Sequence, residues 1–218
     1  MKKVFSLSFI IILIITVGYG CKSNSDKLIN LSPVKEQIKD YHKSGRYNAD
    51  LKTIVKKAEN EFGRVKPKEN SLVIFDIDET TLSNYQFGLE YGFGFNDNIW
   101  DKWVKSKKAT AIKEVKNLYD MLISKGFKIV FITGRNRSQY DATKENLISE
   151  GYTKFDTLIT RRMDALKITA VDYKSEERKQ LVKNGYVIAG TVGDQFSDLK
   201  GPYHGIQVKL PNYRYIVK

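Results

Sequence analysis

The sequence predicts an α/β protein: a Rossmann-like parallel sheet sandwiched by helices, with helices at the N-terminus and a small cap inserted after the first core strand. Three observations predict this fold. Short apolar runs alternate with amphipathic helical patterns from residue 71 onward. The run "FKIVFITG" is apolar at nearly every position, as expected of a strand covered on both faces. Polar residues follow several of the strands, at the edge where parallel sheets bind ligands.

Length and composition set the broad class. The 218 residues suit one domain, and a content of 41% hydrophobic and 12% aromatic residues argues against disorder. The formal net charge is +12, which is compatible with nucleic acid, an anionic membrane or an acidic small substrate. The basic residues are scattered, however, and no nucleic-acid-binding motif accompanies them. We therefore expect a solvated basic surface and no nucleic acid polymer as a partner.

The first twenty residues predict a secretory signal peptide over residues 1–20. Lys2 and Lys3 precede an apolar run that is short for a membrane span. Cys21 is the only cysteine, which excludes an intramolecular disulfide. The stretch "VGYGC" resembles the lipobox of bacterial lipoproteins. That resemblance implies a lipid anchor on Cys21, a tether over residues 21–30, and an exported, membrane-anchored lipoprotein of the bacterial outer membrane or periplasm. An ordinary signal peptide with an incidental cysteine is the alternative.

Two helices are expected to open the mature domain at residues 31–218. The first has Ser32 as a candidate N-cap, Pro33 at its first position and Gly45 past its end. The second begins at Ala49 and places an apolar stripe on one face. Neither helix carries an obvious reactive group, so both are interpreted as packing elements.

The remaining elements alternate in the order of a parallel sheet. Strands are expected at residues 71–76, 127–134, 155–160, 186–194 and 205–210, and helices at 111–126, 137–151 and 174–185. The connection over residues 79–110 is longer than the roughly 15 residues beyond which a connection is usually functional or disordered. It is rich in Tyr, Phe and Trp, which argues against disorder and predicts a cap over residues 83–110. The alternative for several of these aromatic residues is a small satellite core.

Charged and polar residues collect after the strands. The first strand ends in Asp76-Ile77-Asp78, and its two aspartates, two residues apart in extended backbone, point to the same side. The sequence Thr133-Gly134-Arg135 ends the second strand and Lys174 starts the helix after the third. The fourth strand leads to two further carboxylates, at Asp194 and Asp198. These endings together predict one site at the carboxyl edge of the sheet.

The residue types at this site favour phosphoryl transfer. Clustered carboxylates repel one another unless a cation is present, and an all-oxygen site suits Mg²⁺. Thr133, with a hydroxyl and a backbone N–H ahead of a helix, suits a phosphate oxygen. Lys174 supplies a positive charge to a phosphoryl group and to the carboxylates. Phosphoryl transfer needs positioning and charge neutralisation, and these residues provide both.

These residues resemble the four motifs of the haloacid dehalogenase (HAD) superfamily. "FDIDET" resembles motif I, "FITGR" motif II, "YKSEER" with its lysine motif III, and "GDQFSD" motif IV. With the two tryptophans of "W..W", the match extends to the subfamily IIIB acid phosphatases, which include the bacterial class C lipoprotein enzymes. The resemblance covers roughly residues 30 to 218. It implies a Mg²⁺-dependent acid phosphatase that hydrolyses small phosphomonoesters, nucleoside monophosphates among the candidates.

The resemblance also implies a role for each matched residue. Asp76 is the nucleophile that forms an aspartyl-phosphate, and Asp78 is the general acid and then the base. The transferring phosphate is held by Thr133, Gly134 and Lys174. The Mg²⁺ ligands come from Asp76, Asp78 (through its backbone carbonyl), Asp194 and Asp198. The cap residues proposed to contact the leaving group are Tyr91, Phe93 and Trp103.

Two other classes of protein remain as alternatives. A phospho-accepting receiver domain also has an aspartate at a strand end, but its acidic pair lies on the preceding strand. A non-catalytic HAD-like binding or storage protein is the second, although every motif residue is present here. His42 and His204 are interpreted as structural, and arginines near the strand ends, such as Arg135, as either substrate contacts or surface pairs. Glu79 is interpreted as a mark of the acid phosphatase branch without a catalytic role.

Overall fold

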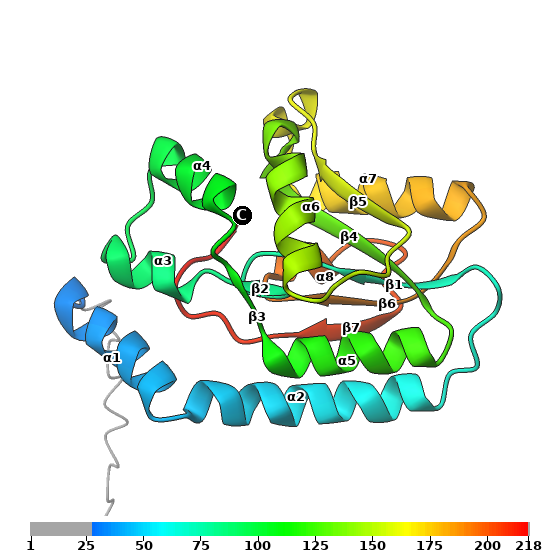
Figure 1. Ribbon diagram of the computed structural model, residues 1–218, viewed down its shortest axis with the longest axis horizontal. Helices are drawn as coiled ribbons and strands as arrows, with labels where there is room; N and C mark the ends of the chain where they lie inside the picture. Colours follow the sequence, from blue (N-terminus) through cyan, green and yellow to red (C-terminus); the bar gives the residue numbers. More distant parts are fainter. Residues whose placement is uncertain (1–27, 218) are drawn as a thin grey trace, which may run out of the picture. The chain divides into compact units, whose positions relative to one another are not determined.

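A five-stranded parallel sheet forms the centre of the domain that begins at Leu31 (Figure 1). The structure is a computed structural model and describes residues 28–217. The strand order is β5-β4-β1-β6-β7, and every neighbouring pair is parallel. The strands are β1 (Ser71–Phe75), β4 (Lys128–Asn136), β5 (Thr157–Arg161), β6 (Val187–Gly193) and β7 (Ile206–Lys209). The α/β fold predicted from the sequence is confirmed.

Helices cover both faces of the sheet. Val73 and Phe75 of β1 belong to the main core cluster, which takes in α2 (Arg46–Gly63), α5 (Lys113–Ser124) and α6 (Tyr140–Ser149). The intervening residues Leu72 and Ile74 face a second cluster with α7 (Ala170–Lys183). Both faces of β1 are therefore apolar and buried, which explains its unbroken hydrophobic sequence.

The N-terminal helices begin earlier than the sequence suggests. Helix α1 spans Leu31–Lys43, so Ser32 lies inside it and is not its N-cap. Gly45 separates the two helices with a φ of 79°, a left-handed conformation that glycine adopts without steric cost. Helix α2 then starts at Arg46, directly after this turn, rather than at Ala49.

The segment predicted as a cap is two short helices enclosed by a two-stranded ribbon. The ribbon pairs β2 (Leu82–Ser83) with β3 (Thr110–Ala111) in antiparallel fashion, and it was not predicted. Between them lie α3 (Tyr85–Glu90) and α4 (Asp97–Ser106), with Asn96 capping α4 by accepting from the backbone N–H of Asn98 and Ile99. Figure 1 shows both helices on the side of the sheet where the strands end. The C-terminal segment after β7 runs along the same side.

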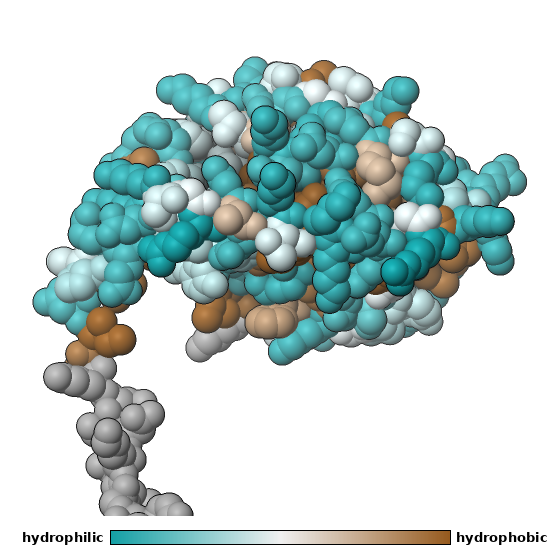
Figure 2. Space-filling view, turned by 90° about the horizontal axis from the view of Figure 1, so that it is seen from below, coloured by the Kyte–Doolittle hydropathy of each residue, from teal (hydrophilic) through white to brown (hydrophobic). Residues whose placement is uncertain are grey.

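Shorter helices complete the domain. They are η1 (Arg137–Gln139), η2 (Asp164–Lys167) and α8 (Phe196–Leu199). The face seen from the side of α2 and α5 is mostly hydrophilic, with small separate hydrophobic areas (Figure 2). Over residues 28–217, none of the helices has the length and apolar character needed to cross a bilayer. The predicted signal peptide and Cys21 lie outside the described residues.

Candidate active site

The loop after β1 carries Asp76 to the edge of the sheet. Its backbone N–H continues the sheet by donating to Val192 O at 3.0 Å. The chain then turns sharply, because Ile77 O accepts from the backbone N–H groups of Thr81 and Leu82, both at 2.9 Å. The Thr81 hydroxyl donates to Asp76 O at 2.5 Å. These contacts fix the Asp76 backbone, and the residue is 7% exposed.

Lys174 lies between two of the predicted carboxylates. Its Nζ is 2.5 Å from Asp76 Oδ1 and 2.5 Å from Asp198 Oδ1. Burial lowers the pKa of Lys174, but Asp198 and Asp76 outweigh that effect and the pKa lies above its usual value. The ammonium group therefore remains charged and joins motifs that are far apart in the sequence. Lys174 lies inside α7 rather than at its start, because that helix begins at Ala170 after the Thr169 cap.

Three buried carboxylates form a group that suits a metal ion. One oxygen from each of Asp76, Asp194 and Asp198 lies within 4.8 Å of the others. Burial raises the pKa of Asp76 well above its usual value and that of Asp194 to about 6, and repulsion from Asp198 adds to both shifts. A cation offsets this cost, and an all-oxygen donor set fits Mg²⁺. At Gly193, a Cβ would lie 2.3 Å from Asp198 Oδ2, so only glycine allows this approach.

Polar neighbours hold both oxygens of Asp194. The Thr80 hydroxyl donates to Oδ1 at 3.1 Å. Gln195 Nε2 and Asn212 Nδ2 each donate to Oδ2 at 2.6 Å. Neighbours of this kind orient a carboxylate that binds metal. Asn212 belongs to the C-terminal segment, which therefore reaches the site.

Asp78 lies in a second polar network. The guanidinium of Arg135 contacts both of its oxygens, with Nη2 2.7 Å from Oδ1 and Nε 3.2 Å from Oδ2. Asn84 Nδ2 donates to Oδ1 at 2.9 Å, and Asn84 Oδ1 in turn accepts from Trp103 Nε1 at 2.8 Å. The Asp78 side chain is 18% exposed, so it is the carboxylate of motif I with the most access to solvent. Its carboxylate is not in the three-carboxylate group, so any metal contact of Asp78 falls to its backbone carbonyl, as the resemblance implies.

The predicted phosphate-binding residues lie next to β1. Because β4 pairs with β1 through Phe75 and Phe131, Thr133 follows at the same edge. The pairing of β4 with β5 shifts between Ile132 and Asn136, which takes residues 133–135 out of the regular ladder. Thr133 is fully buried and its hydroxyl accepts from Arg135 N–H at 3.1 Å, while Gly134 is exposed.

The three predicted cap residues occupy different environments. Tyr91 is 45% exposed and Phe93 is partly buried in left-handed backbone at φ 59°. Trp103 is 6% exposed, belongs to the core cluster and uses its indole N–H on Asn84. Trp103 thus supports the network behind Asp78 and offers no open ring face to a leaving group.

Several site residues were missed or left open by sequence reasoning. Arg135 is 3% exposed and paired with Asp78, so its interpretation as a surface pair is wrong. Arg178, 1% exposed, donates from Nη1 to Asp198 O at 2.7 Å and so supports motif IV. Arg161 and Arg162 make their contacts within the segment that follows β5, and Arg162 also forms an ion pair with Glu177. The sequence signal for Arg135 as a site residue was its position directly after Thr133-Gly134, at the end of a predicted strand.

Comparisons with known proteins agree with the geometry. The family model described as "HAD superfamily, subfamily IIIB (Acid phosphatase)" matches residues 22–218. A stem 31 kDa glycoprotein of Glycine max is 36% identical over 188 residues, which cover 84% of this chain and 74% of that protein. Acid phosphatase 1 of Solanum lycopersicum is 35% identical over 201 residues, covering 86% and 79%. The solved class C acid phosphatase from Bacillus anthracis with tungstate bound has the same fold, with a TM-score of 0.69, 20% identity and coverage of 84% and 86%.

Proposed function

The chain belongs to the acid phosphatases of HAD subfamily IIIB and is a phosphomonoester hydrolase, and we propose that it acts through an aspartyl-phosphate intermediate on Asp76. One observation carries the proposal. Asp76, Lys174 and the pair Asp194 and Asp198 come from three separate segments and meet at the carboxyl edge of β1 and β6, with Lys174 bridging two of the carboxylates. This arrangement combines a carboxylate nucleophile with the positive charge that a transferring phosphoryl group needs.

The proposed reaction has two steps. In the first, an Asp76 oxygen forms a bond to phosphorus while the ester P–O bond breaks, and Asp78 gives its proton to the departing alcohol oxygen. In the second, Asp78 takes a proton from water, the water oxygen attacks phosphorus, and the Asp76–phosphorus bond breaks to release phosphate. The contacts of Arg135 and Asn84 with Asp78 fix the direction of a carboxyl group that must serve both steps.

We propose Mg²⁺ as the cofactor of this reaction. Asp76, Asp194 and Asp198 would supply its side-chain ligands, together with the backbone carbonyl of Asp78. When bound, the ion neutralises charge on the phosphoryl oxygens. Lys174, Thr133 and Gly134 would contact the same phosphoryl group through an ammonium, a hydroxyl and backbone N–H groups.

The proposed substrates are small phosphomonoesters, with nucleoside monophosphates as a class to test. Residues 83–110 would act as the cap that receives the leaving group. Tyr91 and Phe93 support this idea, because they expose aromatic surface on the segment beside the strand ends. A panel of nucleoside, sugar and aryl monophosphates, compared by kcat/KM, would show whether the cap selects a ring. Equal kcat/KM across the panel would contradict ring selection.

We propose that the chain is exported and lipid-modified at Cys21. The support is the sequence pattern of residues 1–21, a charged start, an apolar run and a lipobox-like ending. Expression of the full chain in a bacterium with a radiolabelled fatty acid should label the wild type. Cys21→Ser should carry no label, and equal labelling of both would contradict the anchor.

The catalytic proposal is tested with Asp76→Asn and with metal removal. Asp76→Asn keeps the shape of the side chain and removes its negative charge, so turnover of p-nitrophenyl phosphate should fall by at least about 10³-fold. EDTA should abolish wild-type activity, and added Mg²⁺ should restore it. Asp172→Asn, an exposed change in the first turn of α7, is the matched control. Wild-type rates in Asp76→Asn would contradict the mechanism.

A further inference from the structure

Glu79 is a buried carboxylate at a backbone position that disfavours its side chain. It is 4% exposed and has a φ of 58°, in the left-handed region where residues other than glycine are strained. Glycine would adopt this turn freely, so a glutamate here indicates a task for the carboxylate itself. Glu79 lies outside the group of carboxylates that suits a metal.

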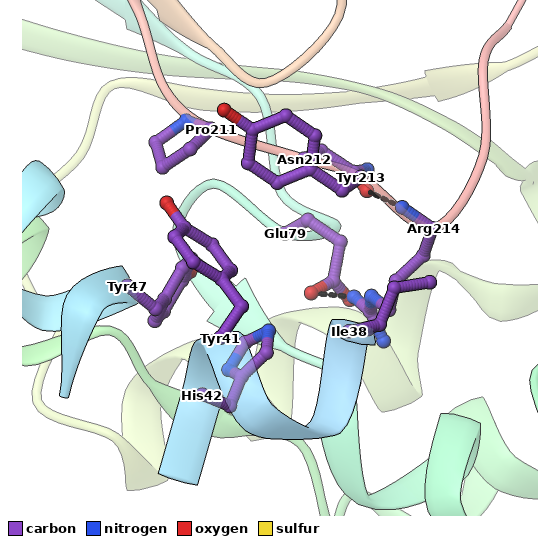
Figure 3. A pocket seen from close by; sticks show the side chains of 9 residues that line it. All are labelled: Ile38, Tyr41, His42, Tyr47, Glu79, Pro211, Asn212, Tyr213 and Arg214. Carbon is purple, nitrogen blue, oxygen red and sulfur yellow. Dashed lines mark hydrogen bonds and ion pairs between the residues drawn. The ribbon is translucent and has the colours of Figure 1, made fainter. Parts of the chain in front are cut away.

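The partner of Glu79 is Arg214, in the C-terminal segment that follows β7. The two groups form an ion pair, and their side chains are 5% and 8% exposed. Figure 3 shows the Glu79 carboxylate directed at the Arg214 guanidinium, with Ile38 of α1 beside them. A buried pair of this kind is sensitive to the loss of one member, because the other charge is left without a partner.

Both members of the pair also hold Asn84. The backbone N–H of Asn84 donates to Glu79 Oε1 at 2.8 Å, and its carbonyl oxygen accepts from Arg214 Nη1 at 3.0 Å. The Asn84 side chain then donates to Asp78, while Trp103 fixes the direction of its amide group. A continuous set of contacts therefore runs from the C-terminal segment to the proposed general acid.

We propose that Glu79 and Arg214 are positioning residues, which hold Asn84 so that the carboxyl group of Asp78 points at the leaving-group oxygen. This inference rests on the proposed function, since it assumes that Asp78 is the proton donor. It gives the C-terminal segment a part in catalysis without contact to the reacting atoms. It also gives Glu79 a purpose that the sequence alone does not assign.

Leaving groups of different basicity separate positioning from simple structural support. An alkoxide or phenolate departs with difficulty unless it receives a proton, whereas p-nitrophenolate is a stable anion and needs little help. A misplaced Asp78 should therefore lower kcat/KM more for phenyl and alkyl phosphates than for p-nitrophenyl phosphate. A partly unfolded population would lower kcat/KM for all of these substrates by one common factor.

The experiment compares Glu79→Gln, Arg214→Lys and the double variant Glu79→Gln/Arg214→Met with the wild type. The double variant removes both charges, so it leaves no unpaired buried charge that would prevent folding. We expect each variant to lose about 10-fold more kcat/KM on phenyl phosphate than on p-nitrophenyl phosphate. Arg64→Met, an exposed arginine at the end of α2, should match the wild type on both.

Asp78→Asn in the same assay distinguishes the two levels of the proposal. If it shows the substrate-dependent loss and the Glu79 and Arg214 variants show a uniform loss or none, positioning by this pair is contradicted while the acid role stands. If Asp78→Asn itself loses both activities by the same factor, the acid role fails and the positioning inference fails with it.

Discussion

Arg135 donates hydrogen bonds to the Asp78 carboxylate from two guanidinium nitrogens, both within 3.2 Å of its oxygens. The arginine side chain is only 1% exposed. Nη1 of the same group donates to the Thr143 hydroxyl at 3.1 Å, and the guanidinium lies 5.7 Å from the centre of the Trp100 ring. A planar group held on three sides has little freedom to move. The direction of Asp78 is thus set by buried contacts, although Asp78 itself reaches the surface.

Arg135→Met should lower kcat by about 10²-fold and leave the overall fold in place, because it frees Asp78 to leave its productive orientation. Arg135→Lys should recover only part of the loss, since an ammonium cannot contact both carboxylate oxygens in the same planar way. Arg137→Met is the control, because that arginine is exposed and lies over Tyr140. Steady-state kinetics and circular dichroism measure the two effects, and an unchanged kcat would contradict the role given to Arg135.

Asn212→Ala should weaken Mg²⁺ binding by about 10–100-fold, because Asp194 loses a donor that fixes its orientation. Isothermal titration of the purified protein with MgCl₂ measures this directly. Asn184→Ala, exposed at the end of α7, should bind the ion like the wild type. Identical affinities for Asn212→Ala and the wild type would show that the C-terminal segment does not support the metal site.

Trp103→Phe should destabilise the protein by about 1–3 kcal/mol, because Asn84 Oδ1 loses its buried donor. Urea unfolding measures the loss. Trp100→Phe replaces a half-buried ring and should cost less. If Trp103→Phe instead kept full stability and raised KM for aromatic substrates, Trp103 would be a substrate contact after all.

His42 should make stability depend on pH. Its ring stacks on Tyr85 with centroids 3.9 Å apart, and burial, with a smaller effect from Arg214, lowers its pKa from 6.5 to about 4. The folded state therefore binds this proton less readily than the unfolded state, so stability is fully present above pH 6.5 and is lost as the pH falls toward 4.

Between about pH 7 and pH 4, the wild type should lose about 1–2 kcal/mol more unfolding free energy than His42→Phe, which cannot take up the proton. Chemical unfolding at both pH values gives the difference, and His204→Gln serves as the control histidine. Parallel losses in the wild type and His42→Phe would mean that His42 takes up its proton as readily in the folded state as in the unfolded state.

The sheet was predictable because its strands are buried on both faces. The runs ending at Phe75 and Gly134 are therefore predominantly apolar, and the alternation of strands with helices indicates a parallel arrangement. The ribbon of β2 and β3 could not be predicted, since two-residue strands carry no periodic signal. Helix α7 begins earlier than predicted, because the Thr169 side chain caps it by accepting from the backbone N–H of Asp172, three residues further on.

The residues of the site likewise include some that were predictable from the sequence and some that were not. Asp76, Lys174 and Asp198 were predictable because strand ends in parallel sheets converge, and the structure brings them within contact distance. Their supporting residues were not predictable, because the contacts cross long stretches of chain: Arg135 and Asp78 are 57 positions apart. Nothing in the local pattern around Asn212 reveals which side chain it faces.

Trapping the phosphoenzyme tests the central claim most directly. The purified protein would be mixed with Mg²⁺ and excess phosphomonoester, quenched in acid within milliseconds, digested and examined by mass spectrometry. The account predicts one added phosphoryl group on the peptide that contains Asp76, labile to hydroxylamine and missing from Asp76→Asn. Full turnover with no phosphorylated peptide at any quench time, or with the group on another residue, would contradict it.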